Sequence, residues 1–577
     1  MIPGVRHMTS PDSRSSFPVS RRSTLASLVG LAASGLLGSG HAQSQDAADK
    51  AVFRHGVASG DPDHASVVIW TRVTASGEQQ LQWQLAQDVA FEQIIQQGST
   101  VTDASRDHTV KVLVDQLEAG AVYYYRFLAG AAVSPAGRTR TLPQGALDRL
   151  GIALVSCSNY PFGFFNAYDA IASDANVDFV LHTGDYLYEY GHDGWGDDVA
   201  QTLGRRHEPA HEIVSLTDYR IRHAQYKTDA GSQAMHAAHP LLACWDDHES
   251  ANNPWTGGAQ NHQQETEGDW QARRAASVQA YFEWMPIREP EWLSQQGRTQ
   301  MQFWRSYSFG DLATLFTLET RHTARAEQID YLAYADKITS AAAASNLVDT
   351  VIAAAERPLL APELETDLLA ALKSSVERKQ PWRLIGNPMP IARTLVPDVV
   401  QLGLLPDPAQ DPNASDDAKA LAWKGRWNLP FYPDTWDGYE WARERLYKLS
   451  RQAGAGDLVF LTGDSHSFWA NQLADAKGQS AGIELGTAGV TSPGDFVSSG
   501  FGDQLSIKLD QAFIDHNPEI VWTDNMHQGY VRLDLTPSGA VADFVAVDTV
   551  LQPAYRTELL ARFALVTRTE GVFIEAL

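Results

Sequence analysis

Cysteine is nearly absent from this chain. Only Cys157 and Cys244 occur among 577 residues, so at most one disulfide can form within it. One disulfide, or two unreactive thiols in the core, is the simplest interpretation. However, Cys157 directly follows an apolar run, whereas Cys244 lies inside one. These different settings favour different roles: a ligand for Cys157 and a core residue for Cys244.

Positive charge is also scarce. The chain has 45 Lys and Arg against 70 Asp and Glu, which gives a formal net charge of -25. This excess of acid argues against a nucleic-acid duplex or an anionic membrane as the partner of the whole surface. An anionic ligand would therefore need a locally positive site, and bound cations could supply it.

Long hydrophobic runs are missing as well, so no permanent membrane anchor is expected. The first 42 residues predict a signal peptide, which we leave out of the fold. A twin-arginine pattern at Ser20-Arg21-Arg22 precedes a short apolar stretch and the small-residue site Gly40-His41-Ala42. We expect the twin-arginine translocation machinery to deliver the chain to the periplasm or outside the cell.

Two regions with different patterns follow the signal peptide. At 577 residues, with 44% hydrophobic and 20% charged content, the chain is long enough for several globular domains. Residues 50–145 contain short strand-like runs separated by turn signals, which predicts an all-β, fibronectin-like sandwich domain. Residues 148–577 alternate apolar runs with helical stretches, which predicts an α/β domain. We expect two sheets packed face to face, with helices outside.

Four polar stretches stand directly after apolar runs in the α/β region. An apolar run that ends in carboxylates and imidazoles is typical of a buried strand that delivers polar groups to one sheet edge. In open α/β folds, ligands bind at that carboxyl-end edge. The pattern therefore predicts a metal-dependent hydrolase. The stretches are Ser156–Asn159, Gly184–Tyr188, Asp246–Glu249 and Gly463–His466.

These stretches supply a set of candidate metal ligands. Asp185, in a Gly-Asp turn, suits a carboxylate that bridges two metals. Tyr188 could bind as a phenolate, a ligand suited to Fe(III), and Tyr186 competes for that role. A Cys157 thiolate would favour a transition metal over calcium. Further carboxylate and imidazole ligands come from Asp247, Asp464 and His466.

The order of these motifs resembles that of the calcineurin-like metallophosphoesterase superfamily. The chain departs from the superfamily pattern in having Cys157 and Asp464 where histidines are usual, and Asp247 where asparagine is usual. These departures resemble the PhoD-type alkaline phosphatases and phosphodiesterases. The resemblance covers nearly all of the chain after the signal peptide, including residues 55–73, 318–321 and 487–494.

The resemblance implies a fold, a cofactor set and an activity. The fold is a metallophosphoesterase two-sheet sandwich with flanking helices at 148–577, preceded by the β-sandwich PhoD N-terminal domain at 50–145. The cofactors are Fe(3+) and Ca(2+). The activity is hydrolysis of phosphomonoesters and phosphodiesters at alkaline pH, with phospholipase D-like members. Iron would be held by Cys157, Asp185 and Tyr188 or Tyr186, and the other ions by Asp185, Asp247, Asn252, Asp464 and His466.

The implied mechanism is in-line attack on phosphorus by a metal-bound hydroxide or oxide. His248 could protonate the leaving oxygen, or it could only support Asp247. Arg321 could clamp a phosphate oxygen, or it could form an ordinary ion pair. Asn387 could bind substrate, although a turn before Pro388 is the simpler role.

Other classes of function are less consistent with the sequence. A phospholipase D of the H-x-K-x4-D type is excluded because that spacing does not occur, although a phospholipase D-like activity through the metal site stays open. A phosphoserine mechanism would need Ser465, which should point away from Asp464 and His466. A binding protein that uses only its β-sandwich is a third alternative. The substrate could be a small molecule or a polymer.

Overall fold

The chain forms two large β-sheets. The first sheet has ten strands in the order β24-β23-β22-β21-β9-β10-β11-β1-β2-β5. Strands β9, β10 and β11 are parallel to one another, and β1 pairs in parallel with β11. The strands are β1 (Val57–Gly60), β2 (Val67–Arg72), β5 (Thr109–Val114), β9 (Leu150–Val155), β10 (Phe179–His182), β11 (Leu241–Ala243), β21 (Gln528–Thr536), β22 (Gly539–Val547), β23 (Thr557–Arg568) and β24 (Gly571–Ala576).

The second sheet has seven strands in the order β14-β15-β16-β17-β19-β18-β20. Strands β15, β16, β17 and β19 are parallel, so their carboxyl ends lie at one edge. The strands are β14 (Ser306–Phe309), β15 (Ala313–Thr317), β16 (Trp382–Asn387), β17 (Leu458–Thr462), β18 (Phe468–Ala474), β19 (Ser480–Gly486) and β20 (Ile520–Asp524).

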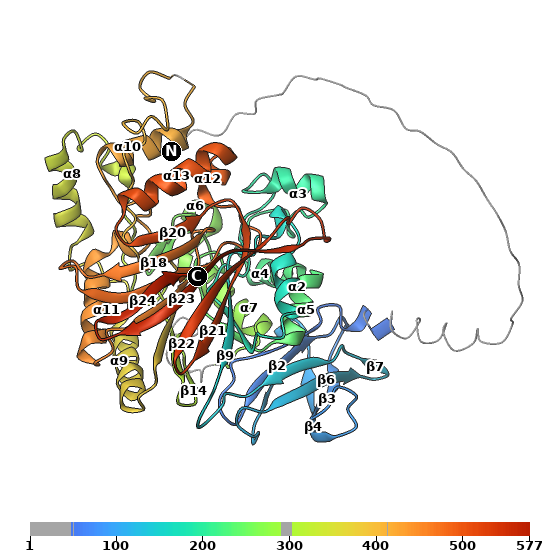
Figure 1. Ribbon diagram of the computed structural model, residues 1–577. Coiled ribbons are helices and arrows are strands. Elements are labelled where there is room, and N and C mark those ends of the chain that lie inside the picture. The colour runs from blue at the N-terminus through green and yellow to red at the C-terminus, as the bar shows by residue number, and fades with distance from the viewer. Residues whose placement is uncertain (1–47, 50, 290–302, 412) are drawn as a thin grey trace, which may run out of the picture. The chain divides into compact units, whose positions relative to one another are not determined.

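The computed structural model describes residues 48–49, 51–289, 303–411 and 413–577 (Figure 1). The expected signal peptide, residues 1–42 with Arg21 and Arg22, lies outside these described residues. Within them, no helix is both long enough and apolar enough to cross a membrane.

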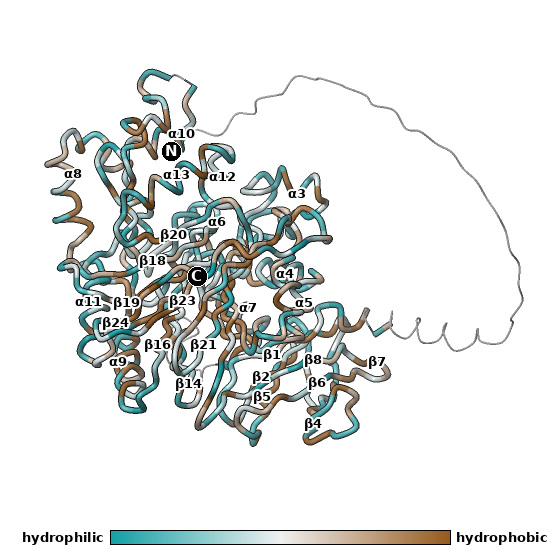
Figure 2. The backbone as a smooth tube through the Cα atoms, viewed as in Figure 1, coloured by the Kyte–Doolittle hydropathy of each residue, from teal (hydrophilic) through white to brown (hydrophobic). Residues whose placement is uncertain are grey.

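The two sheets pack face to face through one hydrophobic core. Leu154 and Leu181 of the first sheet lie in the same cluster as Leu384 and Leu461 of the second. In Figure 2 the hydrophobic colour gathers along the central strands. All residues of β9, β10, β16 and β17 are buried, because both faces of each strand are covered. This is why these strands appear in the sequence as continuous apolar runs.

Helices cover the outer face of each sheet, so the α/β region has four layers. Figure 1 shows α9 and α11 on one side of the sheets and α2, α4 and α5 on the other. The metallophosphoesterase fold class predicted from the sequence is confirmed. The helices are α2 (Asn166–Ala172), α3 (Asp197–Leu203), α4 (Leu216–Tyr226), α5 (Ala230–Ala238), α6 (Gln264–Glu267), α7 (Trp270–Trp284), α8 (Ala341–Leu347), α9 (Pro362–Glu377), α10 (Asp416–Arg426), α11 (Glu440–Gln452), α12 (Asp495–Ser498) and α13 (Asp503–His516).

The β-rich region before residue 145 is shared between two sheets. Five of its strands form a separate sheet in the order β4-β3-β6-β7, with β8 also paired to β6. Its other strands, β1, β2 and β5, extend the ten-stranded sheet. The β-rich region is therefore joined to the α/β region by strand pairing. The separate sheet contains β3 (Gln79–Ala86), β4 (Ile94–Thr102), β6 (Val122–Ala129), β7 (Ala132–Val133) and β8 (Gly137–Arg140).

Candidate metal centre

The carboxyl ends of strands from both sheets meet at one place. Ser156, just after β9, forms a parallel bridge with Gly489, just after β19, and so links the two sheet edges. Cys157 follows β9, Asp185 follows β10, and Asp464 follows β17. The structure thus gathers at one edge side chains that are up to 307 residues apart in the sequence.

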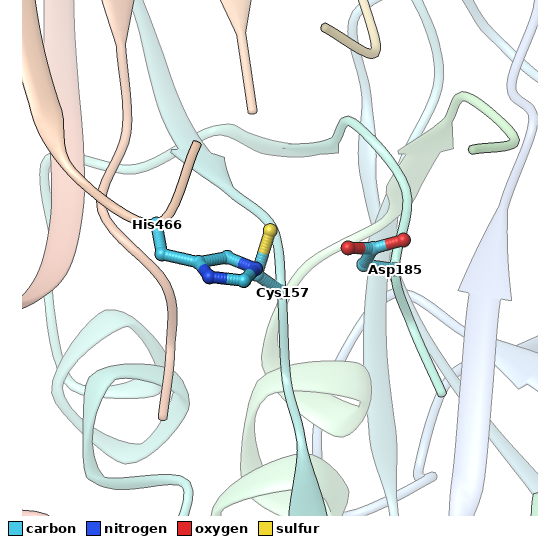
Figure 3. Close-up of side chains that lie close together, drawn as sticks. All are labelled: Cys157, Asp185 and His466. Carbon is cyan, nitrogen blue, oxygen red and sulfur yellow. The ribbon is translucent and has the colours of Figure 1, made fainter. Parts of the chain in front are cut away.

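Three overlapping groups of side chains are suited to hold cations. The first contains Cys157, Asp185 and His466, which point toward one another from separate segments in Figure 3. The second contains Asp185, Asp247 and His248, and in each group the ligand atoms lie within 4.8 Å of one another. Because Asp185 belongs to all three groups, it has the location expected of a bridging carboxylate. The third group is Asp185, Asp246, Asp247 and Asp464.

The backbone at this edge is locally strained. Cys157, Asp185, Asp464 and His466 have φ angles of 60°, 55°, 68° and 55°. Residues other than glycine rarely adopt positive φ, and such strain persists only where the surrounding structure enforces it. Four of the predicted ligands share this conformation, which turns their side chains out of the strand direction and toward a common point.

Glycines before two of the predicted ligands permit close packing of the loops. A Cβ atom at Gly184 would lie 2.2 Å from Cβ of Asp246. A Cβ atom at Gly463 would lie 2.5 Å from Oγ of Ser156. Any larger residue at either glycine would therefore push apart the loops that carry the ligands.

The buried acidic groups of the candidate metal centre have shifted pKa values and unpartnered oxygens, both of which favour bound cations. Burial raises the pKa of Asp185 and of Asp246 well above the usual range, and neighbouring carboxylates raise both further. Burial and the Asp185 charge likewise raise the pKa of the Cys157 thiol. Oδ2 of Asp246 and Oδ1 of Asp247 are buried without a hydrogen-bond partner in the described part of the chain. Buried acids with free oxygens fit divalent or trivalent cations, which would restore the charged forms.

Only one of the two candidate tyrosines reaches the cluster. The Tyr188 hydroxyl donates to Oδ2 of Asp185 at 3.0 Å and lies 3.1 Å from Nε2 of His466. The Tyr186 hydroxyl instead lies 3.0 Å from Nε2 of His236 on α5. Side chains two residues apart share a face in a strand. Here the segment after β10 is irregular, so the alternation does not hold.

His248 is held by an acid that the sequence analysis missed. Its Nδ1 lies 2.6 Å from Oε2 of Glu189, and both side chains are buried. Burial would lower the His248 pKa, but Asp247, Glu189 and Asp185 together raise it well above its usual value. Glu189 directly follows Tyr188 in the sequence. Its place beside the Gly-Asp motif is the only signal that could have pointed to it.

Arg321 lies within the acidic cluster and is completely buried. Its Nε donates to Oδ1 of Asp246 at 2.6 Å, and its Nη2 is 3.3 Å from Oδ1 of Asp464. Nη2 itself has no hydrogen-bond partner among the described residues. Asp246 is thus a second acid at the centre that was not singled out from the sequence. The motif Asp-Asp-His-Glu contained it, but only Asp247 was selected.

The asparagines predicted for the site, and one neighbour of Asn252, make hydrogen bonds within the protein. The side-chain amide of Asn252 donates to Oε1 of Gln260 at 3.0 Å. The neighbouring Asn253 contacts the cluster directly, because its Oδ1 accepts from Nη1 of Arg321 at 3.2 Å. Asn387 is the last residue of β16 and is buried. Both ends of its amide are used, by the Met389 carbonyl at 2.6 Å and by the Trp436 indole at 3.1 Å.

The two cysteines are both free and buried. Cys244 lies in the hydrophobic core between the sheets, among residues such as Leu181 and Leu384. Cys157 lies in the metal-ligand group with Asp185 and His466. Their surroundings therefore differ in the way that the sequence predicts.

A double-sheet α/β fold with buried carboxylates, a thiol and imidazoles at its strand ends defines a metal-dependent hydrolase. The chain belongs to the PhoD-like phosphatase family. Residues 152–544 match the PhoD-like phosphatase model, and residues 40–143 match the model of the PhoD-like phosphatase N-terminal domain. The resemblance inferred from the sequence motifs is thereby confirmed.

Individual relatives agree with this assignment. Alkaline phosphatase D of Bacillus subtilis (strain 168) is 33% identical over 532 residues, which cover 89% of this chain and 80% of that protein. A solved structure described as "Structure of PhoD" superimposes with a TM-score of 0.72 at 29% identity, and covers 91% of this chain and 92% of that one. The chain is therefore a metal-dependent phosphoric ester hydrolase, as predicted.

Proposed function

We propose that the protein is an exported alkaline phosphatase of the D type that cleaves phosphomonoesters and phosphodiesters at a centre of Fe(3+) and Ca(2+). The observation that carries this proposal is the convergence of Cys157, Asp185 and His466 on one point, with the Tyr188 hydroxyl beside them. The predicted signal peptide at residues 1–42 supports export to the periplasm or beyond the cell.

The donor set supports a division of the ligands between two kinds of cation. A thiolate from Cys157 and a phenolate from Tyr188, together with Asp185, suit ferric iron. The oxygen-only donors Asp246, Asp247 and Asp464 suit calcium. When bound, the cations supply Lewis acidity that activates water for attack on phosphorus and neutralises charge on the phosphate.

Arg321 is suited to bind the phosphate of the substrate. The free N–H groups on its Nη2 lie beside Asp464, and the guanidinium is fixed from the other side by Asp246. A guanidinium held in this way can donate to an equatorial phosphate oxygen without first reorganising.

His248 is suited to protonate the leaving oxygen. Glu189 takes the hydrogen bond from Nδ1, which leaves Nε2 as the nitrogen that faces other partners. The neighbouring acids Asp247, Glu189 and Asp185 raise the His248 pKa, which favours the protonated imidazole that such a role requires. In this scheme Glu189 orients the acid and does not itself contact substrate.

A leaving-group series tests the role of His248. We expect His248→Ala to slow the hydrolysis of alkyl phosphates by about a hundredfold or more, and that of p-nitrophenyl phosphate far less, because nitrophenolate leaves without a proton. The measurement is kcat/KM for both esters at one pH. Equal losses on the two esters would contradict the acid role and leave His248 as a support for Asp247.

Activity profiling tests the proposed function as a whole. The mature chain, beginning after residue 42, is assayed from pH 6 to pH 10 with p-nitrophenyl phosphate, bis-p-nitrophenyl phosphate and phosphatidylcholine. Hydrolysis of the first two with an alkaline optimum supports the proposal. Cleavage of phosphatidylcholine alone would favour the phospholipase D-like alternative at the same site.

A further inference from the structure

The side chains that form the metal centre differ in how far they are exposed. Cys157, Asp185, Tyr188 and Arg321 have at most 1% of their surface exposed. The Asp464 side chain, by contrast, is 17% exposed. The more exposed Asp464 and its half-buried neighbour His466 therefore offer a place where the alcohol group of a bound phosphoester can lie.

An aromatic residue borders this open side. Trp195, which is half-buried, lies flat against His466, with ring centroids 5.2 Å apart and 18° between the ring planes. It also lies 5.7 Å from the ring of Tyr188. Phe162, likewise half-buried, meets Trp195 edge to face at 4.7 Å. We call Trp195 and Phe162 the aromatic wall.

The backbone around Trp195 fits this placement. A Cβ atom at Gly196, whose φ is 92°, would lie 2.8 Å from the Phe162 ring. A Cβ atom at Gly194 would lie 2.9 Å from Cβ of Tyr190. The glycines on either side of Trp195 thus allow the loop to pack closely against aromatic neighbours.

A hydrogen bond joins the aromatic wall to the short helix α12. The Trp195 indole N–H donates to Oγ of Ser498 at 3.2 Å, at the last residue of α12. The ring is thus fixed by His466, Phe162 and Ser498 before any ligand binds. A preorganised aromatic surface gains contact energy with little loss of conformational entropy.

We propose that the aromatic wall determines substrate specificity, by packing its exposed edges against the alcohol part of phosphoesters that carry an aromatic ring. The inference rests on the proposed function, because it assigns the leaving-group side of the same site. Aromatic rings prefer offset or edge-to-face contact, which the half-exposed rings of Trp195 and Phe162 offer. Esters of small aliphatic alcohols cannot make this contact.

A pair of matched substrates tests the proposal. 2-Phenylethyl phosphate and ethyl phosphate both release a primary alcohol, so their chemistry is alike and only the ring differs. We expect the metal-loaded enzyme to prefer the phenylethyl ester by about tenfold in kcat/KM. Trp195→Leu should reduce this ratio to about twofold or less, whereas Trp195→Phe, which keeps an aromatic ring, should retain most of it.

Two measurements separate this role from a structural one. Trp441→Leu alters a half-exposed tryptophan on α11 and is the matched control, for which the ratio should stay at the wild-type value. Inhibition constants of 2-phenylethylphosphonate and ethylphosphonate report binding alone. The ratio of these two constants should fall in Trp195→Leu by the same factor as the ratio of the two kcat/KM values. Iron and calcium content is recorded for each variant.

The outcomes are distinct. Loss of the preference in Trp195→Leu, with rescue in Trp195→Phe, supports the proposal. Equal loss on both esters in Trp195→Leu would overturn it and leave Trp195 as a support for His466. No preference in the wild-type enzyme would also overturn it, while the hydrolase function stands. Failure of the wild-type enzyme to hydrolyse either ester would overturn the proposed function and this inference together.

Discussion

The hydroxyls of Tyr188 and Tyr186 contact two different polar clusters, one acidic and one basic. The acidic cluster beside Tyr188 comprises Asp185, Asp246, Asp247 and Asp464. The basic cluster beside Tyr186 comprises His182, His223, His236 and Lys227, each at most 1% exposed. Both clusters consist of ionisable groups that are largely buried.

The basic cluster contains no carboxylate, and both ring nitrogens of His223 lack a hydrogen-bond partner among the described residues. Lys227 donates to Nε2 of His236 at 2.8 Å and lies 4.9 Å from the centre of the Tyr186 ring. Within the described residues it has no carboxylate in ion-pair distance. Burial lowers the pKa of Lys227 well below its usual value, and lowers the pKa of His236 likewise. Both shifts favour the uncharged forms, which can pack in the protein interior without a counterion.

The acidic cluster differs in that its carboxylates can bind cations, which stabilise their charged forms. Four carboxylates face only Arg321 and the His248 imidazole as compensating charges. Oxygens of Asp246 and Asp247 remain buried without partners in the described chain. The comparison indicates that burial alone does not mark a functional site. The mark is a buried charge that the protein leaves uncompensated.

The largest predicted effect comes from removing one ionisable side chain from each cluster. We expect Asp185→Asn to lower kcat/KM for p-nitrophenyl phosphate by about a thousandfold, because the bridging ligand is lost. Lys227→Met should change it less than about threefold, because the Lys227 amine contacts no predicted ligand of the acidic cluster. Steady-state kinetics and metal content check both variants. A large activity loss in Lys227→Met with metals retained would break the proposed contrast.

The two tyrosines give a smaller and sharper contrast. Tyr188→Phe should lower activity by about a hundredfold and reduce the iron content, because a phenolate ligand is removed. Tyr186→Phe removes the same hydroxyl group from the basic cluster, so its activity and iron content should stay within about twofold of wild type. Elemental analysis of iron and steady-state kinetics of both variants show which tyrosine is the ligand. If Tyr186→Phe loses iron and Tyr188→Phe does not, Tyr186 is the iron ligand and the assignment to Tyr188 is wrong.

The smallest predicted effect concerns the pH dependence of folding stability. Burial, with a smaller contribution from Lys227, lowers the pKa of His182 from 6.5 to about 3. The unfolded chain therefore binds a proton that the folded chain rejects. Stability is complete above pH 6.5 and falls as the pH drops toward 3, by up to about 1.4 kcal/mol per pH unit for each such imidazole.

Urea unfolding between pH 7.5 and pH 4.5 measures this dependence. His182→Asn should reduce the slope of unfolding free energy against pH by about one proton in that range. His211→Gln is the control, because the His211 side chain is 66% exposed. An unchanged slope in His182→Asn would show that His182 is not held neutral in the folded chain.

The polar residues at the strand ends could be predicted from the sequence, because each directly follows an apolar run that forms a strand. Cys157, Asp185, Asp247, Asp464 and His466 each follow an apolar run, and the parallel strands place them at one edge. The face-to-face sheets with outer helices followed from the same runs. Local patterns sufficed wherever a regular element decided the geometry.

Contacts decided by irregular loops could not be predicted. Alternation left Tyr186 and Tyr188 equivalent, and only the turn after β10 separates them. Asn252 was selected, but Asn253, at a φ of 50°, reaches Arg321. Pairs such as Glu189 with His248 come from distant segments without a motif that links them. These parts of the site need three-dimensional packing to be seen.

Elemental analysis of the mature protein, purified without added metal, tests the central claim most directly. The account predicts about one iron per chain together with calcium, and loss of iron in Asp185→Asn but not in Lys227→Met. A metal-free protein that hydrolyses phosphoesters at the wild-type rate would contradict it.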